Sequence, residues 1–539
     1  MKQEFDYIIV GAGSAGCVLA NRLSAGGKYT VALLEAGPQD KNFWMKMPMG
    51  IGKLWQDPRF VWNYWTDPEN AIAGQKVFWP RGKALGGSSS INGMIFVRGE
   101  PKRYDEWAEA GNKGWAFDDL LPYFKKVENA PQDTSDIRGK DGPMNCTYGV
   151  YRDEISKSFI KAAEGVGIPF NPDYNGEKAD GVGWLQFTIR DGKRWSTASG
   201  YLHPVAERPN LTVLTEASCE RVLFKGKRAS GVRLRHQGKV TELTAKREVI
   251  LSAGPIISPK LLELSGIGQG DRLQGLGIEV LHNLPGVGEN LIDHLHTRFN
   301  YRVNKKVTLN DLLATKWRGG LSFMNYMLRK RGLMATPTVT AHAMTRSHET
   351  APYADLKLQI AMYSAKDRYL DGEQSGPPTD PFSGIGLGQF NIYPKSRGEV
   401  HITSPDPSVD PAMNANYFSA QGDIEASLAG MRKLREIAQH PDMAQHIIEE
   451  SEPGFDVTSD EDIITYMKET GQTSWHPVCS CRMGHDPLAV VDDRLRVHGL
   501  QGLRVIDSSI FPDMPATNTN IPTIVTAEKG ADMVLEDAK

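Results

Sequence analysis

The chain has 539 residues, 40% of them hydrophobic and 24% charged, and its formal net charge is −3 at pH 7. At roughly 150 residues per domain, this length predicts about two to four domains with sizeable cores. The composition excludes disordered, fibrous and coiled-coil proteins, and the balanced charge argues against nucleic acid as the main partner. Glycine, with 54 residues, is the one residue type in clear excess over its average of about 7%.

The cysteines and the chain start bear on the cellular compartment. The five cysteines are odd in number and mostly far apart, so they predict no disulfide framework; they are Cys17, Cys146, Cys219, Cys479 and Cys481. Acidic residues precede the first apolar run, which therefore does not resemble a signal peptide. No apolar run reaches the roughly eighteen residues of a membrane span. We therefore expect a cytoplasmic protein without a transmembrane segment.

The N-terminal segment predicts a nucleotide-binding βαβ unit. Residues 6–10 form an apolar, β-branched strand, the glycine turn GAGSAG follows at 11–16, and an amphipathic helix then ends at Gly26 and Gly27. A second strand is predicted over 29–37. Strand, glycine turn and helix in this order are typical of dinucleotide-binding folds, in which the helix N-terminus holds the pyrophosphate.

The glycines and one acidic residue have distinct roles in this unit. Gly11 allows the sharp turn, Gly13 lets the backbone approach a pyrophosphate, and Gly16 lets helix and strand pack closely. Glu35 lies 19 residues beyond Gly16, where a carboxylate accepts hydrogen bonds from ribose hydroxyls. This fingerprint does not by itself separate NAD from FAD.

Two further glycine-rich stretches carry a family resemblance. Residues 81–99 predict a loop rich in backbone N–H and hydroxyl donors, and residues 247–268 predict a strand, a turn and a helix. The runs at 82–92 and 254–268 resemble the two diagnostic motifs of the glucose-methanol-choline (GMC) family of FAD-dependent oxidoreductases. The resemblance continues through three further segments, 284–294, 476–484 and 504–523. It implies an FAD enzyme and disfavours an NAD-dependent dehydrogenase.

The resemblance implies contacts with FAD along the whole chain. It places the pyrophosphate at Gly11, Gly13, Ser14, Ala15 and Gly16, and the adenosine ribose at Glu35 and Ala36. It places the pyrophosphate and the flavin N5 and O4 edge along Gly87, Ser88, Asn92, Gly93, Met94 and Ile95, and the adenine at Val222. Asp507 and Ser508 fall at the ribityl chain, and Trp62, Trp475, Pro522 and Thr523 complete the set.

The mode of flavin attachment depends on one position. Some family members bind the flavin covalently through a histidine just before the asparagine equivalent to Asn92. Ile91 occupies that position in this chain. The resemblance therefore implies noncovalent FAD.

Two residues near the C-terminus are the candidate catalytic pair. His476 precedes a proline in a segment that fits no regular element, and an imidazole with an unperturbed pKa of about 6.5 is suited to take a hydroxyl proton. The resemblance implies that His476 is the general base. It places Asn520 at the second catalytic position, where an amide N–H donates to the substrate oxygen. A helix with Pro522 in its first turn would direct its positive dipole end toward the flavin.

Two pairs of residues suggest metal chemistry at first sight. Cys479 and Cys481 form a C-x-C pair, in which the family more often has Gly-Thr in place of Cys479 and Ser480. His294 and His296 also lie close together in the chain. Neither pair has further Cys or His partners at ligand spacing. We therefore expect structural roles for all four residues and no metal site.

The FAD segments are spread over the whole chain, so the nucleotide-binding domain must be discontinuous. We expect an α/β fold, α+β overall, with a Rossmann-like FAD-binding domain over 1–150, 205–300 and 470–539. A substrate-binding domain over 151–204 and 301–469 contains, by resemblance, a mostly antiparallel sheet flanked by helices. The catalytic pair then lies at the domain boundary, where ligand clefts are expected.

Two segments bear on access to the site. Residues 43–65 hold four of the eleven tryptophans and three methionines; they form either a cover over the cofactor or an apolar entrance for aromatic or long-chain alcohols. Residues 365–386 are polar and rich in glycine and proline. They form a lid, an oligomer contact or a solvated loop with neither role.

The leading hypothesis is oxidation of a primary alcohol to the aldehyde, with hydride transfer to flavin N5 and His476 as the base. Oxygen or a quinone-type acceptor would reoxidise the flavin. One alternative is a flavin-containing hydroxynitrile-type lyase on the same fold. The other is a choline-specific dehydrogenase or oxidase, which would need an aromatic cage and often a carboxylate.

Overall fold

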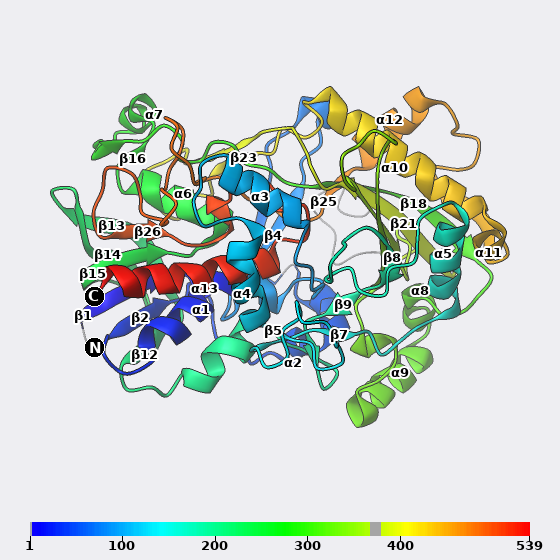
Figure 1. The fold of residues 1–539 in the computed structure, drawn as a ribbon, viewed down its shortest axis with the longest axis horizontal. Coiled ribbons are helices and arrows are strands. Elements are labelled where there is room, and N and C mark those ends of the chain that lie inside the picture. The colour runs from blue at the N-terminus through cyan, green and yellow to red at the C-terminus, as the bar shows by residue number, and fades with distance from the viewer. Residues whose placement is uncertain (1–2, 56, 367–378) are drawn as a thin grey trace.

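The computed structural model describes residues 3–55, 57–366 and 379–539, and two sheets of seven strands each organise it. The first sheet and its helices make up the left half of Figure 1, and the second sheet lies in the right half. The predicted loop at 365–386 lies mostly outside the described residues.

The first sheet is the predicted nucleotide-binding sheet. Its parallel strands follow the order β12 (Leu211–Leu214), β2 (Val31–Leu34), β1 (Glu4–Val10), β15 (Lys239–Leu251) and β26 (Leu503–Val505). The strands β14 (Arg228–His236) and β13 (Ala217–Lys225) continue the sheet in antiparallel fashion from the first half of β15. The central strands are buried on both faces, which explains why their sequences are almost continuously apolar.

The helices α1 (Ser14–Ser24) and α6 (Gly254–Leu264) pack on this sheet, and α13 (Asn520–Asp537) packs on α1. Figure 1 shows α13 crossing α1, on which it packs. The predicted βαβ unit is confirmed, because β1 pairs in parallel with β2 and α1 begins within the glycine turn. A Cβ atom added to Gly16 would lie 1.9 Å from the carbonyl oxygen of Gly11. The close packing expected at Gly16 is therefore present.

The second sheet is antiparallel throughout. Its strands follow the order β24 (Ile447–Glu452), β18 (Leu295–Val303), β21 (Gly384–Asn391), β20 (Leu356–Ala361), β19 (Val339–Thr345) and β8 (Gly181–Trp184), and β25 (Gln472–Thr473) pairs with β18. The helices α10 (Gln421–Gln439) and α5 (Glu154–Gly165) pack on one face through a shared apolar core. The expected antiparallel sheet flanked by helices is confirmed.

Two strands of the second sheet, β18 and β25, include residues that the predicted boundaries assign to the FAD-binding domain. Strand β18 begins at Leu295, so the boundary expected at residue 300 cuts through it. Strand β25 pairs with β18 although it follows residue 470, where the FAD-binding domain was expected to resume. The main chain before His476 therefore runs along the second sheet before it enters the first domain.

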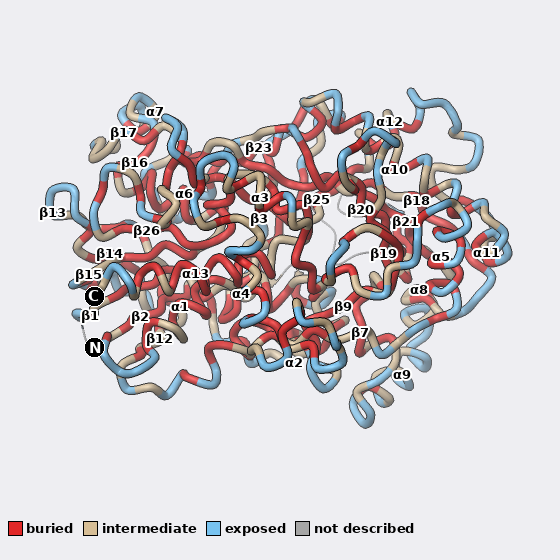
Figure 2. The backbone as a smooth tube through the Cα atoms, viewed as in Figure 1, coloured by how far each residue is buried: buried red, intermediate tan, exposed pale blue. Residues whose placement is uncertain are grey.

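The remaining helices lie at the periphery. They are α2 (Phe43–Lys46), α3 (Pro101–Glu109), α4 (Phe117–Val127), α7 (Gly270–Gly275), α8 (Leu309–Leu313), α9 (Lys316–Arg329), α11 (Pro441–Ala444) and α12 (Asp460–Thr470). Figure 2 shows buried strands in the interior of both halves and a largely exposed α9 at the lower right. Among the described residues, no helix combines the length and apolarity needed to cross a membrane.

Candidate active site

A cavity of about 980 Å³ is lined by residues of both halves of the molecule. Most of the residues expected to contact FAD or substrate line it: Gly11, Gly13, Ser14, Ala15, Glu35, Ala36, Trp62, Gly87, Ser88, Asn92, Gly93, Met94, Ile95, Trp475, His476, Asp507, Ser508, Asn520 and Thr523. These residues come from separate stretches of the chain. The fold therefore brings the predicted positions together around one elongated space.

Three of the expected cofactor residues do not line this cavity. Gly16 lies beneath the glycine turn, and Pro522 is buried in the first turn of α13. The backbone N–H of Val222 donates to the hydroxyl of Ser265, whereas Cys219 and Glu220 of the same strand line the cavity. A register shift in β13 between positions 219 and 221 breaks the strand alternation, so sequence pattern could not identify the lining pair.

At the dinucleotide end of the cavity, separate main-chain segments lie very close to one another. Gly11 has a φ of +98°, and a Cβ atom at Gly87 would lie 2.6 Å from Cα of Gly13. The hydroxyl of Ser14 donates to Oδ1 of Asn520 over 2.7 Å. Backbone N–H groups at the start of α1 can therefore face a pyrophosphate without intervening side chains. This cradle fits the FAD that the sequence implies.

Glu35 is fixed at the end of β2 by the main chain. Its carboxylate accepts hydrogen bonds from the N–H of Ala12 at 3.1 Å and of Gly37 at 2.9 Å. Burial raises the pKa of the Glu35 carboxyl to about 7. Each oxygen keeps a second lone pair, so the carboxylate can still accept hydrogen bonds from ribose hydroxyls.

The loop that carries His476 is anchored by a buried aspartate. Oδ1 of Asp293 accepts from the backbone N–H of His476 at 2.8 Å, and Oδ2 accepts from the hydroxyls of Tyr417 and Thr473. Trp475, just before the histidine, has a φ of 61°, in the left-handed region. A residue held in that region needs firm support from its surroundings, and Asp293 supplies part of it.

A chain of hydrogen bonds fixes the tautomer of His476. The carbonyl of Ile392 can only accept, so Nε2 of His294 donates to it at 3.4 Å. Nδ1 of His294 is then an acceptor for Nδ1–H of His476 at 3.0 Å. At the other end, Nζ of Lys357 donates to Oδ1 of Asn518 at 2.6 Å, which turns Nδ2 of Asn518 toward Nε2 of His476 at 2.9 Å. Nε2 of His476 is therefore left without a proton.

The electrostatic surroundings keep this histidine neutral. Burial, with His294 and Lys357 adding to the effect, holds the pKa of His476 well below its usual range. Burial also lowers the pKa of His294 to about 3 and that of Lys357 to about 7. A neutral imidazole with an unprotonated Nε2 is the form that can accept a proton from an alcohol.

The structure places Asn518, and not Asn520, beside His476. The Asn520 side chain begins α13 and bonds Ser14 at the dinucleotide end. Asn518 was missed because two asparagines stand two residues apart in the sequence and the segment predicts no regular element that would orient them. Lys357 was missed because nothing in the pattern of β20 signals a charged residue facing the site.

The second sheet presents donor side chains to the cavity. Across the sheet, Gln359 of β20 lies opposite Gly388 of β21, which lies opposite Arg298 of β18. A Cβ atom at Gly388 would lie 2.3 Å from Nε2 of His296, so the glycine makes room for that ring. Nε2 of His296 lies 3.0 Å from Nε2 of Gln359, and both side chains line the cavity. His296 therefore lies at the cavity and His294 lies behind His476, and the structural roles expected for both stay a prediction.

The cysteines near the site are buried thiols. Cys479 and Cys481 are free, and burial raises the pKa of both thiols well above the usual range. Cys479 has a φ of 73°. That left-handed conformation favours glycine, which explains why the family more often has glycine at this position.

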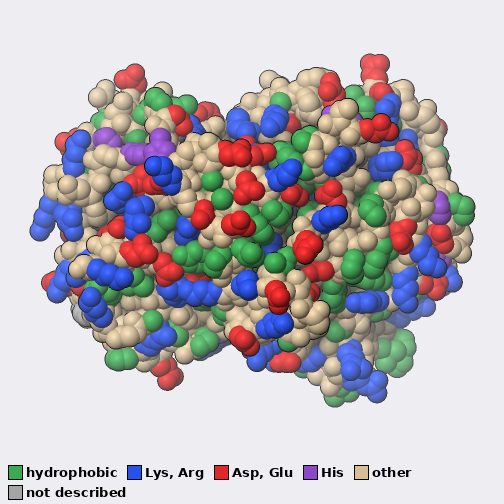
Figure 3. All heavy atoms as spheres, in the orientation of Figure 1, with side chains coloured by type: hydrophobic (Ala, Val, Ile, Leu, Met, Phe, Trp, Pro, Cys, Tyr) green, Lys and Arg blue, Asp and Glu red, His purple; other side chains and the backbone are tan. Residues whose placement is uncertain are grey.

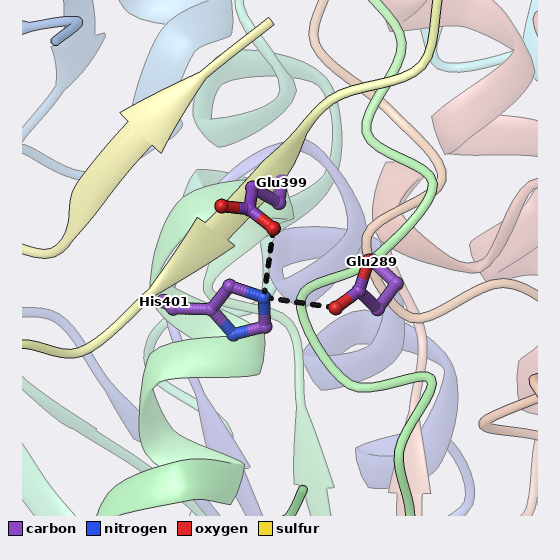
Figure 4. A group of neighbouring side chains, drawn as sticks. All are labelled: Glu289, Glu399 and His401. Carbon is purple, nitrogen blue, oxygen red and sulfur yellow. Dashed lines mark hydrogen bonds and ion pairs between the residues drawn. The ribbon is translucent and has the colours of Figure 1, made fainter. Parts of the chain in front are cut away.

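Within the part of the chain that the structure describes, one group of possible metal ligands is present, and it consists of Glu289, Glu399 and His401 (Figure 4). Nε2 of His401 lies 3.2 Å from Glu289 and 3.7 Å from Glu399, and its Nδ1 lies 2.7 Å from Glu263. Burial lowers the pKa of His401, but its hydrogen bonds to carboxylates outweigh burial and raise it to about 9. Near neutral pH both ring nitrogens carry protons, and the group is an ion-pair cluster.

Comparison with known proteins identifies the family. Models of the GMC oxidoreductase family match residues 5–296 and 394–527. The chain is 41% identical over 544 residues to the oxygen-dependent choline dehydrogenase of Photobacterium profundum, covering 99% of this chain and 94% of that relative. It is 39% identical over 534 residues to the alcohol dehydrogenase (acceptor) of Pseudomonas putida, covering 98% and 96%.

Solved structures agree with these relatives. Pyridoxine 4-oxidase from Mesorbium loti superposes with a TM-score of 0.87 at 29% identity, covering 98% of both chains. A formate oxidase of Aspergillus oryzae RIB40, determined to study modification of its FAD, superposes with a TM-score of 0.91 at 26% identity over 99% of both chains. The family models and the nearly full-length relatives show that this chain belongs to the GMC oxidoreductases, as an FAD-dependent enzyme that oxidises alcohols.

Proposed function

We propose that Nε2 of His476 removes the hydroxyl proton of a primary alcohol while Asn518 holds the alcohol oxygen. The observation that carries this proposal is the hydrogen-bond chain from Ile392 to Lys357, which leaves Nε2 as the proton acceptor. When bound, FAD supplies the two-electron acceptor that takes the hydride from the carbinol carbon. The protein then provides the base and the orientation of the oxygen.

Asn518 takes the role that the sequence suggested for Asn520. One N–H of the Asn518 amide bonds the single lone pair of Nε2 of His476. We propose that the alcohol hydroxyl replaces this bond and donates to Nε2, while the amide N–H groups are donated to the alcohol oxygen as it gains negative charge. Asn520 is proposed instead to support the pyrophosphate turn through Ser14. The first turn of α13 also lines the cavity at Thr523, which supports the proposed stabilisation of negative charge by its dipole.

Lys357 is proposed as a positioning residue. It is fully buried, and its bond to Oδ1 allows only one orientation of the Asn518 amide. A second effect is electrostatic, since a positive charge here opposes protonation of His476. Both effects favour the base form of the histidine.

We propose that the substrate is a neutral or anionic alcohol and not choline. The described carboxylates that line the cavity all lie toward the nucleotide-binding domain: Glu35, Glu220, Asp406, Asp410 and Asp507. Asp406 and Asp410 flank a segment whose carbonyls accept hydrogen bonds from Lys260 of α6. No described cavity-lining residue of β18, β20 or β21 is acidic.

The charges on the second sheet support this choice. Arg298 lines the cavity, and its side chain donates a hydrogen bond to the carbonyl of Ala365 at 2.8 Å. A quaternary ammonium beside the second sheet would therefore meet the positive charge of Arg298. Trp55, Trp62 and Phe390 supply aromatic surface, which suits a benzylic or other apolar alcohol.

The binding of FAD is proposed to be noncovalent. Ile91 lines the cavity just before Asn92, and its side chain has no group that could bond the flavin. Acid precipitation of the purified protein should then release all yellow colour into the supernatant. Colour that stays in the pellet would contradict the proposal.

The cysteines bear on the cellular compartment, and a reoxidation experiment identifies the electron acceptor. All five cysteines are unpaired and four are buried, which suits a reducing compartment and supports a cytoplasmic location. The acceptor, oxygen or a quinone-type compound, is identified by admitting air to the reduced enzyme. Rapid return of the flavin colour with peroxide indicates an oxidase, whereas slow return that a quinone accelerates indicates a dehydrogenase.

Anaerobic mixing with a panel of compounds tests the proposed function. The panel contains benzyl alcohol, 4-(hydroxymethyl)benzoate, hexan-1-ol, choline and mandelonitrile, and the readout is the bleaching of the flavin absorbance. We expect bleaching by the uncharged and anionic alcohols and the slowest bleaching by choline. Cleavage of mandelonitrile without bleaching would favour a lyase. Choline as the best reductant would overturn the proposed substrate class but not the alcohol oxidation.

A further inference from the structure

Helix α9 carries an exposed apolar stripe, which we call the α9 stripe. It consists of Trp317, Leu321, Met324 and Leu328, all of them exposed. Trp317 keeps 74% and Leu328 83% of their surface accessible. The spacings of three and four residues place the stripe on one side of the helix. A contiguous exposed apolar surface of this kind marks an interaction site more often than chance.

The opposite side of α9 is firmly packed, so the orientation of the stripe is fixed. Tyr326 is buried in a small apolar cluster with Met47 and Ala335, and Phe323 packs against it. The ring centroid of Phe323 lies 5.9 Å from that of Phe43, which is itself an exposed apolar side chain. The stripe therefore faces solvent because the helix is held from behind, and Phe43 extends the apolar surface.

Basic residues flank the α9 stripe. Lys316 and Arg318 lie in the first turn, and Arg329, Lys330 and Arg331 lie at the end of the helix, while residues 315–331 contain no Asp or Glu. Figure 3 shows hydrophobic and basic side chains together at the lower right, where α9 projects. Apolar residues bordered by Lys and Arg are typical of helices that lie in the headgroup region of a membrane.

The α9 stripe lies next to the active-site cavity. Leu309 and Leu313 of the preceding helix α8 line the cavity. So does Met49, which packs with Phe323 behind α9. A surface bound through α9 would therefore lie beside one wall of the cavity. An apolar alcohol or a quinone dissolved in lipid would meet the enzyme on this side.

We propose that α9 is a membrane-surface anchor that binds bilayers containing anionic lipid. Charge selects this occupant over a second copy of the chain. An isologous dimer through the stripe would bring the basic residues of two copies together, with no acidic residue on either helix to pair them. Anionic headgroups complement the same charges, and each Lys or Arg near such a surface strengthens binding roughly fivefold.

Sedimentation with lipid vesicles tests the anchor on the FAD-loaded, full-length enzyme. We expect it to pellet with vesicles of phosphatidylcholine and phosphatidylglycerol, and much less with phosphatidylcholine alone or in high salt. A variant with Trp317→Gln and Leu328→Gln should lose binding at least tenfold, and a variant with Arg318→Gln and Arg329→Gln should lose it selectively for anionic vesicles. None of these four side chains lines the cavity, so benzyl alcohol oxidation in solution should be unchanged.

A matched control comes from exposed apolar residues elsewhere. Ile448 and Phe455 are also exposed, and their replacement by glutamine should leave vesicle binding intact. Failure of the wild type to bind anionic vesicles would overturn the proposal. A second result would also overturn it: sedimentation velocity shows a concentration-dependent dimer, the Trp317 and Leu328 variant abolishes that dimer, and no vesicle binding is found. In that case α9 would be a contact between two copies of the chain.

Discussion

The two sheets contribute to the active site by different means. The first sheet presents main chain, packed so closely at Gly11, Gly16 and Gly87 that a Cβ atom on any of them would clash with backbone atoms. The second sheet presents side chains from the strands on either side of β21: Arg298 of β18 lines the cavity, and Lys357 of β20 bonds Asn518 beside His476. We therefore expect backbone geometry to hold the cofactor and side-chain chemistry to set the rate and the selectivity toward the alcohol.

This difference predicts that substitutions in the first sheet and in the second sheet have different effects on the enzyme. A substitution that disturbs the glycine turns should change FAD retention. A substitution on the second sheet, or in the loop that ends at His476, should leave the yellow holoenzyme intact and change its reaction. The following experiments separate the two outcomes, beginning with the largest effect.

His476→Ala should show the largest loss of rate. Removing the base should slow anaerobic flavin reduction by benzyl alcohol by roughly 10²- to 10⁴-fold, because general base catalysis typically contributes that much. FAD content and thermal stability should stay near those of the wild type, since the backbone N–H of residue 476 still bonds Asp293. An unchanged reduction rate in the yellow variant would end the assignment of His476 as the base.

A pair of glycine substitutions compares the two sheets directly. In Gly16→Ala the new methyl group would meet the backbone oxygen of Gly11 at 1.9 Å, and backbone cannot move aside cheaply. Overpacking of this kind costs about 1–3 kcal/mol or more, so we expect purified protein with little or no FAD. In Gly388→Ala the neighbour is the end of the His296 side chain at 2.3 Å, which can rotate. That variant should keep FAD and show a raised KM for the alcohol.

The absorbance ratio of protein to flavin and the thermal unfolding midpoint give both readouts. Gly52 offers a control on the cavity wall, because no atom lies within 4 Å of an added Cβ. Gly52→Ala should bind FAD normally. Normal FAD content in Gly16→Ala would contradict the close packing of α1 on the first sheet.

The contrast between the sheets also explains which parts of the structure could be predicted from the sequence. The βαβ unit was predictable because glycine spacing and a strand of apolar residues are local signals, and β1, α1 and β2 follow them. The FAD cavity was predictable because its contacts lie in motifs matched as continuous runs. In β13 the register shift places Cys219 and Glu220 at the cavity and not Val222, and the expected contact of Val222 with adenine stays a prediction.

The second sheet was harder to predict because its site depends on register between distant strands. Arg298 and Gln359 are far apart in the chain, and only pairing with β21 sets them across from each other. The exchange of Asn520 for Asn518 has a similar origin. The two residues stand two positions apart at the start of α13, and only contacts with Lys357 and Ser14 distinguish them.

Substitution of the two asparagines tests that distinction. Asn518→Ala should slow flavin reduction by roughly 10- to 100-fold with normal FAD content, because the oxygen loses a donor whose bond to developing charge is worth about 1.5–3 kcal/mol. Asn520→Ala should have a smaller effect on the reduction rate and weaken FAD binding through Ser14. Rapid-mixing rates and FAD dissociation constants separate the two. If Asn520→Ala proved the slower variant at full FAD occupancy, the role would return to Asn520.

Lys357→Met has the smallest expected effect and a characteristic pH signature. Burial, His294 and the lysine charge together hold the pKa of His476 well below its usual range, so loss of the charge raises that pKa. The base is then protonated up to a higher pH, and the acidic limb of kcat/KM must shift toward higher pH. Arg81 and His296, which also face His476, are unchanged in the variant and limit the shift.

The same variant separates positioning from simple structural support. A purely structural lysine would change stability without moving the acidic limb, whereas a positioning lysine moves the limb and lowers kcat/KM roughly tenfold, because the Asn518 amide loses the bond that orients it. Lys102→Met, at an exposed lysine of α3, should change neither. A pH profile of Lys357→Met that overlays the wild type, in protein with full FAD content, would show that Lys357 acts on neither His476 nor Asn518. The selectivity of the second sheet would then rest on Arg298 and its neighbours in β18 and β21 alone.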